Sequence, residues 1–279
     1  MTVRVTRDPA AFAELVFPFL QRDPVLNTTI LSNVSDRVRG LVDDPEPPVF
    51  VSVHNPAGEV LGAVIWTALR GINLSGLPTG LVPHVVDVLA NAVPRARSVI
   101  GSADAARLFA EQYAVRTGRA FVPSERVRLH KLGTFVPQRA VGTPRLAEPA
   151  DLDVLTPFFG AYRQEVGHAA EGAEADRRWL EQRTEHHRLW IWDCNGHLVA
   201  LVGHQAPAFG AVRIGPVYTP PPYRGHGYAS ALTAHVTQTL SAAGNQVCLM
   251  TDLANPTSNK IYAAIGYEPL QDLVAYKFS

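Results

Sequence analysis

Two stretches of the chain have the hydrophobic pattern of a β-hairpin. The expected strands are residues 49–53 and 60–66 in the first hairpin and residues 189–192 and 198–202 in the second. The first turn ends at Gly58, and the second contains Asn195-Gly196, a strong hairpin signal. Because Gly58 and Gly196 occupy equivalent places in the two stretches, the pattern predicts an internal duplication.

The elements around the two hairpins follow the same order. Each half opens with a short strand, at residues 2–6 and 144–147, followed by helical stretches with apolar residues at helical spacing. The segments after the hairpins, each set predicting a strand, a helix and a strand, are residues 72–74, 82–93 and 98–100 in the first half and residues 212–218, 229–243 and 246–251 in the second. This order predicts an α/β sandwich with a mixed sheet in each half.

A segment bounded by Pro137 and Pro144 separates the halves and contains Gly142, so it interrupts any periodic pattern. We therefore expect a domain at residues 1–136, a linker at residues 137–144 and a second domain at residues 145–279. The length of 279 residues also suits about two domains at roughly 150 residues each.

Composition excludes several classes of protein. Lys and Arg together number 25, and so do Asp and Glu. The chain therefore has no excess positive charge that would favour nucleic-acid binding. The most apolar stretch, residues 60–69, is far shorter than the roughly 20 residues that span a bilayer, and the N-terminus lacks a clean apolar signal segment. Cys194 and Cys248 form neither a disulfide framework nor a metal-ligand spacing. We expect a cytoplasmic protein without a metal, a membrane segment or a nucleic-acid partner.

The first chemical motif lies between the strand at residues 212–218 and the helix at residues 229–243. It reads Arg224-Gly225-His226-Gly227-Tyr228-Ala229-Ser230. Glycines let a turn bring successive backbone N–H groups close to a ligand, and the first N–H groups of a helix are unpaired at its positive end. This arrangement suits a pyrophosphate, although a glycine-containing turn without a ligand would have the same pattern.

A second motif predicts a helix of about ten residues. Asn255 is a good N-cap, Pro256 suits the first helical position, and Gly266 suits the C-terminal end. At 100° per residue, four polar or aromatic residues share one arc of this helix, namely Asn255, Ser258, Asn259 and Tyr262. That arc lies beside an apolar one, so it is expected to face something other than the core.

Together the two motifs resemble the GNAT superfamily of acetyl-CoA-dependent N-acetyltransferases. The resemblance covers residues 145–279, whereas the first half looks like a degenerate copy, because residues 74–83 lack the Arg-x-x-Gly-x-Ala pattern. It implies two tandem GNAT-like domains with one site for acetyl-CoA, which leaves as CoA. The residues that the resemblance assigns to this cofactor are Val217, Tyr218, Thr219, Arg224, Gly225, His226, Gly227, Tyr228, Ala229, Ser230, Asn255 and Ser258.

The implied reaction is direct attack of a primary amine, on a small molecule or a peptide, on the thioester. The resemblance places Tyr262 near the sulfur, where it would act as the general acid; the alternative is a packed aromatic with its hydroxyl at the helix edge. The general base is open, because the strand at residues 211–218 contains no carboxylate. Glu165 and His168 lie three apart on one helical face and are candidates for substrate contact, or for a solvated surface. Asp252 could bind the amine or stabilise the start of the next helix.

Other functions stay open at this point. An acyl-CoA-binding sensor would keep the cofactor site without turnover, and the two-domain layout is also similar to mycothiol synthase and to aminoglycoside acetyltransferases. The identity of the amine and the oligomeric state do not follow from the motifs. His186, His187 and His204 share no ligand spacing, and we expect them to be hairpin residues.

Overall fold

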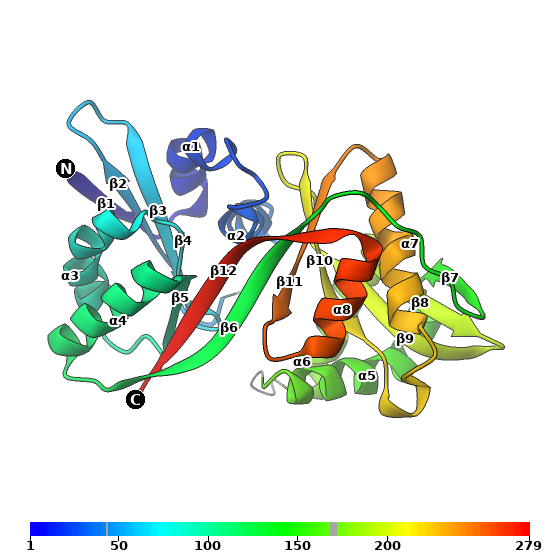
Figure 1. Ribbon diagram of the computed structural model, residues 1–279. Helices are drawn as coiled ribbons and strands as arrows, with labels where there is room; N and C mark the ends of the chain where they lie inside the picture. Colours follow the sequence, from blue (N-terminus) through cyan, green and yellow to red (C-terminus); the bar gives the residue numbers. More distant parts are fainter. Residues whose placement is uncertain (43, 168–171) are drawn as a thin grey trace. The chain divides into compact units, whose positions relative to one another are not determined.

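The computed structural model describes residues 1–42, 44–167 and 172–279 (Figure 1). The described chain divides into two compact units. Unit 1 comprises Met1–His130, Thr251–Pro256 and Pro269–Ser279, and unit 2 comprises Lys131–Met250 and Thr257–Glu268. The expected domains follow the chain without interruption, whereas these units do not. Unit 1 includes two segments from the C-terminal half of the chain.

Unit 1 is built on a mixed sheet in the order β1-β2-β3-β4-β5-β12-β6. Its strands are β1 (Thr2–Thr6), β2 (Val49–His54), β3 (Val60–Thr67), β4 (Gly71–Gly76), β5 (Ser98–Ser102), β6 (Phe121–Leu132) and β12 (Tyr267–Phe278), of which the last two continue beyond the unit. Its helices are α1 (Pro9–Leu20), α2 (Thr28–Val38), α3 (Val82–Ala92) and α4 (Ala103–Thr117). Strands β4 and β5 are parallel, and β12 pairs with β5 in antiparallel orientation.

Helices cover both faces of the unit 1 sheet. Side chains of successive strand residues point to opposite faces. Val51 of β2 packs in one apolar cluster with residues of α3 and α4, whereas the neighbouring Phe50 stacks on Phe12 of α1 at 4.9 Å between ring centroids. The C-terminal Phe278 belongs to the same cluster as Val51 and contacts the Tyr113 ring at 4.7 Å. The core of unit 1 therefore contains a side chain from the far end of the sequence.

Unit 2 repeats this element order. Its strands are β7 (Thr143–Leu146), β8 (Leu189–Cys194), β9 (His197–His204), β10 (Ala211–Tyr218) and β11 (Gln246–Asp252), of which the last continues into unit 1, in the order β11-β10-β9-β8-β7. Its helices are α5 (Leu152–Glu165), α6 (Ala173–Glu185), α7 (Tyr228–Ala242) and α8 (Pro256–Ile265). Strands β10 and β11 are parallel, and the other described pairs within this order are antiparallel.

Two apolar clusters hold the helices of unit 2 against the sheet. Leu232 of α7 and Ile265 of α8 pack in one cluster, and Leu155 of α5 and Leu180 of α6 pack in the other. Tyr218, the last residue of β10, belongs to the α5–α6 cluster, whereas Val217 packs against the α7–α8 cluster. The end of β10 therefore lies between helices on both faces.

The structure confirms most of the expected elements. Both hairpins are present as β2–β3 and β8–β9, and the ten-residue helix is α8. The mixed α/β class is confirmed in both units. Two histidines were placed wrongly, because His186 follows the last residue of α6 and His187 precedes β8, whereas His204 does end the strand β9.

Candidate functional site

The end of β10 has backbone groups that the sheet does not use. The parallel register with β11 runs from Ala211 to Ile214. On the other side, Ile214 pairs with His204 and Val217 pairs with Val202, so β10 contains one extra residue there, as in a β-bulge. Val217 and Tyr218 thus stay paired with β9 after the registered pairing with β11 has ended. Their open edge can accept an extended ligand arm through backbone hydrogen bonds.

A turn with two glycines in the left-handed region leads from β10 into α7. Gly225 has a φ of +82° and Gly227 a φ of +80°, a conformation that residues with a Cβ rarely adopt. A Cβ at Gly225 would meet nothing within 4 Å, so the space beside this backbone is free of described protein atoms. These glycines therefore shape a turn whose backbone a ligand can approach closely.

The first turn of α7 supplies unpaired donors. Its N-cap, Gly227, makes no side-chain hydrogen bond, and the first helical hydrogen bond runs from the Ala231 N–H to the Gly227 carbonyl at 2.9 Å. The N–H groups of Tyr228, Ala229 and Ser230 consequently have no acceptor within the helix. Three such donors at the positive end of a helix suit an anion.

Thr219 adds an unsatisfied group between the strand and the turn. Its Oγ1 is buried and has no hydrogen-bond partner in the described part of the chain. A buried hydroxyl without a hydrogen bond destabilises the folded protein by about 1–3 kcal/mol. A ligand that forms the missing hydrogen bond would remove this cost. The open strand edge, the free helical donors and this hydroxyl together fit the arm and the phosphates of a CoA molecule.

Arg224 and Glu165 form an ion pair that joins this turn to α5. Arg224 Nη2 donates to both carboxylate oxygens of Glu165 at 2.7 Å, and Arg224 Nε donates to the Thr219 carbonyl at 2.9 Å. The Tyr218 hydroxyl donates to Glu165 Oε1 at 3.1 Å. Burial and the nearby Glu165 carboxylate raise the pKa of Tyr218, so this hydroxyl stays protonated. The structure thus brings together a candidate substrate residue and three candidate cofactor residues.

The turn is held by a second set of contacts. His226 Nδ1 donates to the Arg224 carbonyl at 2.9 Å, and its ring stacks on Tyr228 at 5.4 Å between centroids. The Tyr228 hydroxyl in turn donates to Cys194 Sγ at 3.4 Å. Cys194 therefore supports the turn, a role that its isolated position in the sequence does not reveal.

Tyr262 lies within the apolar cluster of α7 and α8. It is 7% exposed and packs edge-on against Tyr267 at 6.2 Å, and Val217 and Tyr228 pack against the same cluster. Burial raises its pKa far above the usual value, and the neighbouring Tyr162 adds to this effect. Its hydroxyl therefore keeps its proton at neutral pH.

Three comparisons place this geometry among known proteins. Residues 194–274 match the family model described as FR47-like protein. A GNAT-family acetyltransferase from Colwellia psychrerythraea is similar over 100% of both chains, with a TM-score of 0.64 and 11% identity. A tandem GNAT protein from the clavulanic acid biosynthesis pathway is similar over 100% of this chain and 98% of its own, with a TM-score of 0.59 and 13% identity. The protein has a tandem GNAT fold.

A GCN5-related N-acetyltransferase from Sphaerobacter thermophilus supports the same assignment. It is similar over 99% of this chain and 94% of its own, with a TM-score of 0.62 and 17% identity. No curated protein sequence matches this chain. The resemblance to GNAT proteins and the expected tandem fold are thus confirmed at the level of structure. The GNAT motif residues 217–230 all lie in unit 2.

The remaining candidate residues are placed less completely. Ser258 is half-buried in the first turn of α8, within unit 2. Asn255 is exposed and belongs to the Thr251–Pro256 segment of unit 1. His168 lies outside the described residues. Tyr162 was not singled out in the sequence, because nothing in its pattern distinguishes it from other aromatic residues of a buried helix face.

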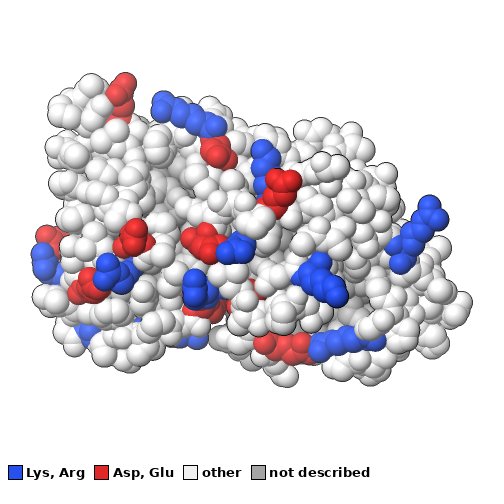
Figure 2. All heavy atoms as spheres, viewed as in Figure 1, with Lys and Arg blue, Asp and Glu red and all other residues white. Residues whose placement is uncertain are grey.

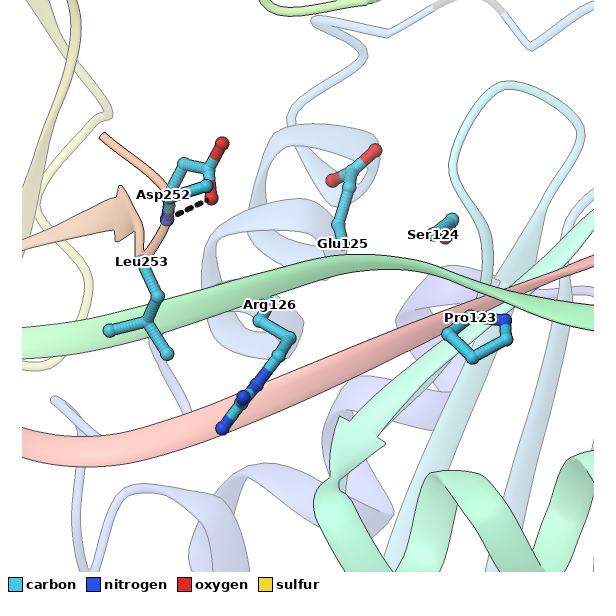
Figure 3. Close-up of a pocket in the computed structure, with 7 residues that line it drawn as sticks. Pro123, Ser124, Glu125, Arg126, Asp252 and Leu253 are labelled. Carbon is cyan, nitrogen blue, oxygen red and sulfur yellow. Dashed lines mark hydrogen bonds between the residues drawn. The ribbon is translucent and has the colours of Figure 1, made fainter.

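Asp252 takes a structural contact in unit 1. Its Oδ1 accepts from the Ala254 N–H at 2.8 Å, which stabilises the turn before α8. Figure 3 shows it beside a pocket of about 470 Å³. The pocket is lined by Pro123, Ser124, Glu125, Arg126, Asp252, Leu253 and Ala254. The Glu125 side chain lies on the same side of the β6 ribbon as Asp252, and Arg126 lies on the other side. These residues are distinct from the unit 2 motifs.

The surface and the helices add three findings. Figure 2 shows acidic and basic side chains interspersed on the visible face, with no large area of a single sign. Across residues 1–42, 44–167 and 172–279, no group of three or more His, Cys, Asp or Glu residues is arranged to hold a metal ion. In the same part of the chain, every helix is too short or too polar to cross a membrane.

Proposed function

We propose that this protein transfers an acetyl group from acetyl-CoA to a primary amine at unit 2. The observation that carries the proposal is the junction of β10 and α7, where an open strand edge leads to a glycine turn and three unpaired helical N–H groups. Acetyl-CoA would supply an activated acetyl thioester. The GNAT fold supports acyl transfer in general, and the amine acceptor is part of our proposal.

The chain would bind the cofactor through three groups. Backbone atoms of Val217, Tyr218 and Thr219 would hold its extended arm, and the amides from Gly225 to Ser230 would hold its pyrophosphate. Ser258 would add a contact from the first turn of α8. Because the glycine turn is held by His226 and Tyr228, the amides are oriented before the ligand arrives.

Tyr262 would hold the proton that the leaving thiolate needs. Its buried hydroxyl stays protonated because burial raises the pKa, and a proton donor must be protonated to act. Glu165 would contact the acceptor amine, since its carboxylate lies beside the end of β10 through the Tyr218 hydroxyl. This division assigns the cofactor to β10 and α7 and the acceptor to the α5 side of the same strand.

A direct test measures CoA binding by calorimetry and thiol release from acetyl-CoA across a panel of amines. We expect Tyr262→Phe to lower kcat by about 100-fold or more while the affinity for CoA is retained, because general acid catalysis is worth roughly 10²–10⁴. Tyr267→Phe is the matched control. Tyr267 is also buried, at 3% exposed, but its hydroxyl is hydrogen-bonded to Thr237 Oγ1 at 2.7 Å, so kcat should change little.

Two outcomes would redirect the proposal. Binding of CoA with no thiol release for any amine would favour an acyl-CoA sensor over an enzyme. A kcat of Tyr262→Phe within about twofold of the original would remove Tyr262 as the acid and leave it as a packed aromatic.

A further inference from the structure

The Arg224–Glu165 pair places a cation where an amine acceptor would be bound. The Arg224 guanidinium sits on both oxygens of Glu165 at 2.7 Å, and its Cζ lies 5.7 Å from the centroid of the Tyr218 ring. A carboxylate beside an aromatic face is a binding site for organic cations, including ammonium groups. The Tyr162 ring lies edge-on to Tyr218 at 6.2 Å and extends the aromatic wall.

Arg224 is also the first residue of the phosphate turn. It directly precedes Gly225, and the unpaired N–H groups of α7 begin four residues later. A guanidinium forms strong bidentate hydrogen bonds with phosphate as well as with carboxylate. Arg224 therefore has two competing classes of partner, one present in the protein and one on the expected cofactor.

The existing ion pair is exposed enough to be exchanged. The side chains of Arg224 and Glu165 are 47% and 44% exposed, and an exposed ion pair contributes little to stability. The buried pair Arg163–Asp176 in the same unit, with side chains 11% and 8% exposed, shows the contrasting case of a pair enclosed by protein. Exchange of Arg224 from Glu165 to a phosphate therefore needs no rearrangement of the core.

We propose that Arg224 occupies the cation subsite formed by Glu165 and Tyr218 in the free protein and leaves it for the phosphates of bound acetyl-CoA. The inference rests on the proposed function and assigns its acceptor to cationic amines. Once vacated, the Glu165 carboxylate and the Tyr218 ring receive the acceptor's ammonium group. Cofactor binding thereby increases the affinity for the amine, and by linkage the amine increases the affinity for the cofactor.

The test uses benzylammonium and its neutral analogue benzyl alcohol as probes, titrated into the full chain by NMR or calorimetry, with and without saturating CoA. CoA replaces acetyl-CoA so that no turnover occurs. We expect benzylammonium to bind at least tenfold more tightly to the CoA complex than to the free protein, and benzyl alcohol to bind weakly to both.

Variants separate the parts of the proposal. Arg224→Gln should bind benzylammonium tightly without CoA, so the enhancement by CoA disappears. Glu165→Gln should lose benzylammonium binding in both states while CoA still binds. Arg177→Gln is the matched control, since Arg177 forms a pair with Glu181 in the same unit, with side chains 42% and 40% exposed, and should preserve the enhancement.

The outcomes distinguish this inference from the proposed function. If CoA binds but benzylammonium affinity is the same with and without it, or is unchanged in Arg224→Gln and Glu165→Gln, the inference is wrong and the CoA site stands. If benzyl alcohol binds as well as benzylammonium, the subsite does not select cations. Failure of CoA to bind the original chain overturns the proposed function and this inference with it.

Discussion

The two units share a topology but differ where their parallel strands separate. In unit 2 the last registered pair of β10 and β11 is Ile214–Leu249, and a Cβ on the next residue, Gly215, would meet nothing within 4 Å. In unit 1 the last registered pair of β4 and β5 is Asn73–Ile100. The next residue, Leu74, would have its Cβ only 2.9 Å from a Cβ added at Gly101. Unit 1 thus has a leucine at the position after the last registered pair, where unit 2 has a glycine.

The helices that follow these strands differ in the same direction. α7 begins after two left-handed glycines with three unpaired N–H groups, whereas α3 begins with Val82-Pro83, and proline has no N–H to donate. Unit 1 keeps the bulge, because Asn73 pairs with Ile65 and Gly76 with Ala63, but it lacks the full set of helical donors. The fold alone therefore does not make the site, which depends on a few residues at one junction.

The largest expected effect tests how unit 1 depends on the C-terminus. Phe278→Ala removes a ring that is 7% exposed and packs on Tyr113, so unit 1 should lose about 3–5 kcal/mol of unfolding free energy. Denaturant unfolding, with hydrogen exchange in α4 as the local readout, measures the loss. Exposed Lys277→Ala is the control and should change stability by less than about 0.5 kcal/mol. Unchanged protection of α4 in Phe278→Ala would contradict the assignment of this strand to the unit 1 core.

The next prediction compares a glycine substitution in unit 2 with one in unit 1. Gly225→Val places a β-branched side chain at a φ of +82° and in the path of a ligand, so CoA affinity should fall by about 100-fold. Gly80→Val changes a glycine in the corresponding segment of unit 1, where φ is not positive and a Cβ meets nothing within 4 Å, and it should leave CoA affinity unchanged. Calorimetric titration of both variants with CoA measures the two affinities. A comparable loss of CoA affinity in Gly80→Val would contradict the assignment of the cofactor site to unit 2.

A smaller effect separates binding from stability at Thr219. Thr219→Val removes a buried hydroxyl that has no partner in the described residues, so unfolding free energy should stay equal or rise by up to about 1 kcal/mol, while CoA affinity falls by about tenfold. Thr233→Val removes a hydroxyl of the same kind from α7 and should show the stability effect alone. Equal CoA affinities for the two variants would exclude Thr219 from the site.

The sequence predicted those elements that are formed by residues close together in the chain. Hairpins, the α8 helix and the glycine turn follow from short patterns, because hydrogen bonds between near neighbours determine them. The place of β12 in unit 1 could not be predicted, since the pairing of Ala275 with Ile100 joins strands far apart in the chain and leaves no local signal. The contact of Arg224 with Glu165 was missed for the same reason.

The smallest effect compares one buried histidine in each unit. Burial, reinforced by Arg128, lowers the pKa of His130 in unit 1, and burial, reinforced by Arg188, lowers the pKa of His204 in unit 2. A lowered folded-state pKa means that the unfolded chain binds the proton more tightly. The contribution of each neutral histidine to the unfolding free energy is therefore fully present above the ordinary pKa of about 6.5. It is lost as the pH falls below that value, by at most about 1.4 kcal/mol per pH unit for each histidine.

The two variants act as controls for each other. His130→Gln should flatten the acid dependence of hydrogen exchange in α4 of unit 1 and leave α7 of unit 2 unchanged, and His204→Gln should do the reverse. Since His235 in α7 also has a lowered pKa through burial, the flattening in unit 2 should be incomplete. If either variant changed both units equally, the two units would unfold as one, and the difference between them would lie in the ligand site alone.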